Sequence, residues 1–129
     1  MSFLPVASRA LIAVLFIWSG MSKIFALEPT YHYIAAAGLP VPALALLGAI
    51  ALELGAGLWL ITGWGLRLTA ASLALFSLCT AVVFHHNFAD ENELIHFLKN
   101  VAIAGGLFAM AANAPSSRRF ANAADVAAV

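Results

Sequence analysis

Charged and hydrogen-bonding side chains stand inside segments of this sequence that are otherwise apolar enough to lie in hydrocarbon. A charge at the centre of a bilayer costs roughly 2.5–3.5 kcal/mol even on insertion scales, so such residues are expected to face one another, a cavity or a partner. Grouped together, they could pair charges, relay protons or hold the polar end of a ligand. This predicted polar seam consists of Arg9, Lys23, Glu53, Arg67, His85, His96, Lys99 and Asn100.

The composition indicates that the solvent around these residues is a lipid bilayer. Hydrophobic residues make up 64% of the 129 positions and charged residues only 9%, against roughly 25% charged in soluble domains. The net charge of zero gives no electrostatic footprint for nucleic acid. Cys79 is the single cysteine, which excludes an internal disulfide, a CxxC redox pair and a cysteine zinc site.

Four segments have the roughly 20 mostly apolar residues that a spanning helix needs. The sequence therefore predicts an all-α integral membrane protein, a four-helix antiparallel bundle occupying residues 1–112. The expected spans are about 4–27, 41–62, 64–86 and 94–112. Residues 113–129 are expected to form a cytoplasmic, largely disordered tail, because they are polar and rich in small residues.

The connections between the spans differ in length. The Thr62–Gly65 turn is tight and predicts that the second and third spans are antiparallel neighbours. The first connection is longer and is expected to be a loop, whose Tyr31, His32 and Tyr33 suit the headgroup layer where aromatic rings collect.

The placement of lysine and arginine predicts the orientation. Arg9 and Arg67 fall on the same side as Arg118 and Arg119, whereas the third connection, with Asp90, Glu91 and Glu93, is acidic. The positive-inside rule then places both termini in the cytoplasm and the acidic connection outside.

Glu53 and Lys99 are the two charges that lie deepest in their spans. At 1.5 Å per residue, Glu53 lies about 15 Å from the cytoplasmic end of its span and Lys99 about 10 Å from the outer end. Their depths in a core of ~30 Å then differ by about 5 Å, which the two side chains can bridge. We therefore expect a Glu53–Lys99 pair, or a Glu53–Arg9 pair if the order of the helices forbids the first.

The remaining members of the seam have simpler interpretations. Arg9, Lys23 and Arg67 lie within two turns of a helix end, from which their long side chains can reach the interface. His85 and His96 fall near the outer ends of their spans, where solvation is favoured over ligation of a haem or a metal. No metal site is predicted.

Several stretches together resemble the DoxX family of small bacterial inner-membrane proteins with four helices. These are RALIAVLFIWSGMSK (9–23), ELGAGLWLITGWGLR (53–67), FHH (84–86) and HFLKNVAIAGG (96–106). The resemblance covers about residues 9–107. Its matched polar positions are Arg9, Ser19, Gly20, Lys23, Glu53, Arg67, His85, Lys99 and Asn100.

The resemblance implies a function in redox chemistry. The family takes its name from a subunit of a thiosulfate:quinone oxidoreductase, and other members are linked to respiratory or oxidative-stress systems. The sequence shows no flavin, haem or thiol motif, so we expect a membrane subunit or accessory and not a self-sufficient enzyme. The implied ligand is a quinone, with no intrinsic cofactor. The resemblance also implies a redox partner protein. The composition makes the bilayer the other partner and nucleic acid none, and the small-residue faces of the second span (Gly48, Gly55) and of the fourth favour association with a second copy of the chain.

Two alternatives remain open at this point. The chain could be a small transporter or permeability protein in which Glu53 and Lys99 carry protons or substrate. It could instead be a structural membrane protein without chemistry, whose buried charges fix the register of the helices.

The predicted orientation can be tested with reporter fusions. A reporter that is active only in the cytoplasm is expected to be active when fused after Ala112 and inactive when inserted within residues 88–92, because of the positive-inside bias. Cytoplasmic activity of the insertion within 88–92 would show that the orientation is wrong.

Overall fold

The computed structural model describes residues 2–115, and their regular structure is entirely helical. The helices are α1 (Leu4–Phe25), α2 (Leu27–Ala36), α3 (Pro42–Thr62), α4 (Leu66–Phe84) and α5 (Glu91–Asn113). Within the described range, four of them, α1, α3, α4 and α5, are long and apolar enough to cross a membrane. The prediction of an all-α protein with four spans is confirmed.

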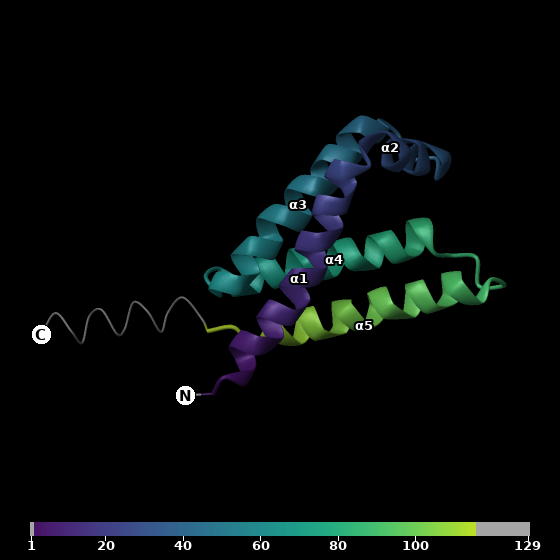
Figure 1. Ribbon diagram of the computed structural model, residues 1–129. Coiled ribbons are helices and arrows are strands. Elements are labelled where there is room, and N and C mark those ends of the chain that lie inside the picture. The colour runs from purple at the N-terminus through teal and green to yellow at the C-terminus, as the bar shows by residue number, and fades with distance from the viewer. Residues whose placement is uncertain (1, 116–129) are drawn as a thin grey trace, which may run out of the picture.

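The four long helices form two antiparallel pairs, α1 with α3 and α4 with α5, which cross each other obliquely (Figure 1). The buried core lies where the pairs meet, and several of its members are alanines. Alanine side chains let helix backbones approach closely, which is how helices pack in lipid. The core consists of Ala13, Phe16, Leu60, Ala70, Leu73, Ala74, Ala104, Leu107 and Ala111.

The pairs diverge on the side away from the N-terminus, and α2 lies at that open side (Figure 1). The sequence predicts a loop between the first two spans, and this is wrong for residues 28–36, which are helical. Pro29 is compatible with a helix because it stands in the first turn, where its missing N–H has no intrahelical partner to lose. Ala26 breaks the path from α1 with φ −133° and ψ 49°, and Gly38 follows the end of α2 with φ +81°.

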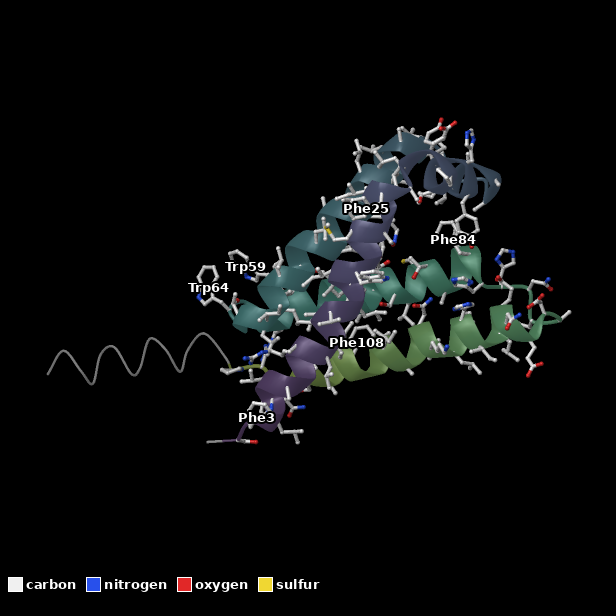
Figure 2. The ribbon with its side chains drawn as sticks, in the orientation of Figure 1. Phe3, Phe25, Trp59, Trp64, Phe84 and Phe108 are labelled. Carbon is white, nitrogen blue, oxygen red and sulfur yellow. The ribbon has the colours of Figure 1, made fainter. Side chains whose placement is uncertain are left out.

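The α3–α4 turn depends on two glycines. Gly63 and Gly65 have φ values of +74° and +61°, a left-handed conformation that side chains with a Cβ rarely adopt. Trp59 and Trp64 project outward together beside this turn (Figure 2). Beyond the turn α3 and α4 diverge, so they are neighbours only over part of their length, and each packs more extensively on its other partner.

The last helix is longer than predicted at both ends. It starts at Glu91 because the Asp90 side chain caps it, with Oδ1 accepting hydrogen bonds from the backbone N–H groups of Asn92 and Glu93 at 2.9 and 3.1 Å. It continues to Asn113, one residue into the expected tail. Ala114 and Pro115 are described as well, and the remainder of the predicted disorder, residues 116–129, lies outside the described range.

Close contact between α1 and α3 predicts an asymmetry between two glycines of α3. A Cβ at Gly57 would lie 3.1 Å from Ile17 Cγ1 and 3.4 Å from Phe16 Cβ, whereas a Cβ at Gly55 would meet nothing within 4 Å. Gly57→Leu is therefore expected to lower the stability in detergent by about 1–3 kcal/mol through overpacking.

Gly55→Leu is the matched control for this change, because it adds the same side chain to the same helix on an open face. It should leave the thermal midpoint close to that of the unaltered protein. Equal losses in the two variants would contradict the packing of α1 on α3.

Candidate functional site

A cavity of about 470 Å³ lies between the two helix pairs and beneath α2. All five helices contribute to its wall, which is mostly apolar, with Leu15, Phe16 and Phe76 among the lining residues. The Tyr33 ring of α2 stacks on Phe84 at the end of α4, with ring centroids 5.2 Å apart and planes 17° from parallel. Figure 2 shows Phe84 projecting from the end of α4 toward α2. Both rings line the cavity.

The inner end of the cavity contains an ion pair between α1 and α3. Lys23 Nζ lies 2.9 Å from Glu53 Oε2 and 3.1 Å from Oε1, and only 5% of the Glu53 side chain is exposed. Ser19, one turn before Lys23, donates its hydroxyl hydrogen to Glu53 Oε1 at 2.8 Å. Lys23 in turn donates to Ser19 Oγ at 2.8 Å. We call Ser19, Lys23 and Glu53 the inner cluster.

Gly20 explains how α3 comes close enough to form this cluster. A Cβ at that position would lie 2.8 Å from Leu54 Cγ and 3.3 Å from Glu53 Cβ. Because Gly20 has no side chain, the stretch of α3 that carries Glu53 can pack closely on α1. The Glu53 side chain then lies directly between Ser19 and Lys23. A four-residue spacing places those two side chains on one face of the helix.

The predicted Glu53–Lys99 pair is wrong, and so is the alternative pair with Arg9. The inward face of α5 is the one that carries Ala104 and Leu107. Asn100 shares this face and lines the cavity. Lys99, about 100° around the helix from Asn100, is exposed. Depth along a span can be counted from the sequence, but the rotation of α5 about its axis depends on packing against the other helices.

The two arginines of the seam lie away from the cavity. The Arg9 guanidinium packs against the α3–α4 turn, where a Cβ on Gly63 would be 2.8 Å from Arg9 Cζ. Arg67 is in the first turn of α4, and its Nη2 donates to the Ala114 carbonyl at 3.4 Å. Arg67 and His85 therefore mark opposite ends of α4 and do not form one continuous seam.

The outer end of the cavity contains a second polar group, formed where α4 ends and α5 begins. His85 Nδ1 lies 3.2 Å from Glu93 Oε2, and the His85 ring stacks on His96 with centroids 5.1 Å apart.

Partial burial, and to a smaller extent the charge of Glu93, raise the pKa of Tyr33 above its ordinary value. The Tyr33 phenol is therefore neutral near pH 7 and can donate a hydrogen bond.

The structure thus brings five of the eight predicted site residues to one cavity and leaves three outside it. Arg9, Arg67 and Lys99 are the three outside. The five that line it are Lys23, Glu53, His85, His96 and Asn100. Within the described residues, no group of three or more His, Cys, Asp or Glu side chains could hold a metal ion.

Sequence reasoning missed several polar contributors to this cavity. Ser19 appeared only through the family resemblance, although its spacing from Lys23 was a usable signal. Thr30 and Tyr33 were missed because α2 was taken for a loop. Ser77 and Thr80 also line the cavity, and they carry no sequence signal that separates them from ordinary packing residues of a spanning helix.

The inner cluster predicts strong coupling between two substitutions. Lys23→Met leaves a buried carboxylate without its cation, and Glu53→Gln leaves the cation without its anion. Breaking a buried pair costs about 3–5 kcal/mol, and we expect about 2 kcal/mol here because 22% of the Lys23 side chain is exposed. The double variant should recover part of that loss, measured as thermal stability in detergent.

Lys99→Met is the matched control, because it removes a lysine that takes no part in the pair. Its expected effect is within about 0.5 kcal/mol, as for other exposed positions. Strictly additive losses for Lys23→Met and Glu53→Gln, or a loss for Lys99→Met as large as that for Lys23→Met, would contradict the assignment of the pair.

Comparison with known proteins places this arrangement in a family. The family model of DoxX matches residues 4–86, which include α1 to α4 and therefore the whole inner cluster. No solved structure matches the chain.

Two relatives from Escherichia coli (strain K12) extend the match into α5. The chain is 39% identical to "Inner membrane protein YqjF" over 110 residues, which are 85% of this chain and 83% of the relative. It is 31% identical to "Inner membrane protein YphA" over 115 residues, which are 85% and 82% of the two chains. With four spans among its described residues, this chain is a multi-pass inner-membrane protein that belongs to the DoxX family.

Proposed function

We propose that this protein is the membrane component of a quinone-linked redox system, and that its cavity holds the ring of a quinone or of its reduced form. The cavity carries the proposal. Its volume of about 470 Å³ falls within the roughly 300–1,000 Å³ of small-molecule sites, which are typically apolar with a few placed polar groups.

The distribution of polarity supports a ring-shaped ligand with polar substituents. Most of the cavity wall is apolar, with side chains such as Leu15 and Phe76, which suit the faces of an aromatic ring. The inner cluster and the group around His85 provide hydrogen-bonding atoms at separate parts of the wall.

In this proposal a partner protein exchanges electrons with the bound ring. The chain itself contributes the binding site and polar groups that orient the ring. An accessory function of this kind is consistent with a single small domain in which the candidate chemistry is confined to one cavity.

Blocking the cavity provides the test. Ala49 of α3 lines the cavity, whereas Ala51 of the same helix is exposed on the outer face. Protein solubilised gently from native membranes is expected to carry quinone that extraction and mass spectrometry detect. Ala49→Phe should reduce the amount at least tenfold, because the phenyl ring occupies the space of the ligand.

Ala51→Phe is the matched control and should retain quinone at the level of the unaltered protein. Equal retention by the two variants would indicate carry-over with lipid, which contradicts a site in the cavity. The proposal would also be contradicted if the unaltered protein bound no quinone, both in native membranes and after solubilisation in detergent.

A further inference from the structure

Two arginines lie at the end of the bundle that holds the α3–α4 turn, away from the cavity. On α1, Arg9 comes four residues before the core residue Ala13, and on α4, Arg67 comes three residues before the core residue Ala70. Side chains three or four residues apart share one face of a helix. Both arginines therefore continue the inward faces of their helices by one turn, toward this end of the bundle.

The contacts of the two arginines bring them to the same region. The Arg9 guanidinium packs on the turn, where a Cβ at Gly63 would lie 2.8 Å from Arg9 Cζ and from Nη1. Arg67 follows Gly63 by four residues, which span at most about 14 Å, and its Nη2 donates to the Ala114 carbonyl at 3.4 Å. Figure 1 shows the start of α1, the α3–α4 turn and the end of α5 at this one end of the molecule.

Most hydrogen-bond donors of the two arginines have no acceptor among the described residues. A guanidinium carries five N–H groups. Arg67 uses one of them in the bond to the Ala114 carbonyl. Arg9 makes no hydrogen bond or ion pair to another described residue, and its Nε is buried. Because Arg9 is partly exposed and Arg67 is exposed, a ligand at the surface can reach the terminal nitrogens of both.

The described part of the chain also provides no carboxylate at this end. Of its five acidic residues, one is in α2, one is paired in the inner cluster and three lie where α4 connects to α5; they are Glu28, Glu53, Asp90, Glu91 and Glu93. The C-terminal carbonyls of α3 and α5 lie near the arginines, but they carry only partial charges. The first turn of α4 has no acidic residue and no side-chain cap, so its free N–H groups add positive potential.

Two tryptophans place this end of the molecule at the level of lipid headgroups. Trp59 and Trp64 project outward together beside the α3–α4 turn, with ring centroids 5.4 Å apart (Figure 2). Tryptophan collects at the interface between membrane and water, where one part of the ring is apolar and the other is hydrated. The anions of that layer are the phosphates of phospholipids, and guanidinium groups bind phosphate oxygens through paired N–H···O bonds.

We propose that Arg9 and Arg67 form a binding site for the phosphate group of an anionic phospholipid. The headgroup supplies the counter-ion that the described residues lack, and its acyl chains remain in the bilayer beside the helices. A headgroup with a net negative charge, such as phosphatidylglycerol, is favoured over phosphatidylcholine, whose trimethylammonium group already balances its phosphate. The site is separate from the cavity and independent of the proposed function.

The test measures lipid binding to the full-length protein by native mass spectrometry in a neutral detergent. Dioleoyl phosphatidylglycerol and dioleoyl phosphatidylcholine carry the same acyl chains, so the ratio of their affinities reports the headgroup alone. The first molecule of phosphatidylglycerol is expected to bind at least about tenfold more tightly, because each arginine near an anionic lipid contributes roughly fivefold. Arg9→Gln and Arg67→Gln should therefore each lower the preference roughly fivefold.

Lys99→Gln is the matched control, because it removes an exposed cation of α5 that lies outside the site. It should leave the preference for phosphatidylglycerol unchanged. The same loss of preference in Lys99→Gln as in the two arginine variants would indicate general attraction between opposite charges and overturn the site. Equal binding of the two lipids to the unaltered protein would also overturn it, and this comparison decides the question even if an arginine variant does not fold.

Inorganic phosphate distinguishes a lipid from a soluble ligand, because it has the same chemical group without acyl chains. Added in large excess over the lipid at constant ionic strength, it is expected to leave the binding of phosphatidylglycerol unchanged. Displacement of the lipid by inorganic phosphate would identify a site for a free anion and overturn the assignment to a phospholipid.

Discussion

A carboxylate buried between membrane helices requires a cation, and Glu53 obtains one from the neighbouring helix. Hydrocarbon supplies neither water nor counterions, so the Lys23–Glu53 pair and the Ser19 hydroxyl together replace the solvation that both charges would have in water. This requirement fixes which faces of α1 and α3 meet. Gly20 permits the close approach, and the register of the two helices follows.

The second consequence of this packing is the cavity. The α1–α3 pair and the α4–α5 pair touch through a core of alanine and leucine, and they diverge on the side that holds α2. Side chains in an alanine-rich core are short, so the pairs can cross closely at one point without remaining close along their length. The space between the diverging ends is then bounded by α2, through the stack of Tyr33 on Phe84.

The charged residues outside the inner cluster lie near the two ends of the molecule, the arginines at one end and the acidic residues at the other. Arg9 and Arg67 lie at the end that holds the α3–α4 turn. Glu93 and its neighbours lie at the other end, where α4 connects to α5. Lys99 is exposed about 12 Å along α5 from its first residue, and its long side chain can extend back toward the interface. The cavity thus retains one charge pair at its inner end and polar groups at its outer end.

The sequence by itself determined the solvent, the number of spans and the inventory of polar residues. These properties depend on composition and local hydropathy, both of which can be read completely from one amino-acid sequence. It also contained the helical spacing of Ser19 and Lys23. It did not contain α2, because a ten-residue helix with a proline in its first turn has the same local signals as a loop.

Only the tertiary structure decided which polar residues meet. Depth along a span can be counted from the sequence, but the rotation of each helix about its axis depends on packing against its neighbours. A rotation of about 100° separates adjacent residues on a helix. That difference places Asn100 in the cavity and Lys99 outside it. The order of the helices is also a packing property. It pairs Glu53 with Lys23, because α3 packs beside α1 while α5 packs beside α4.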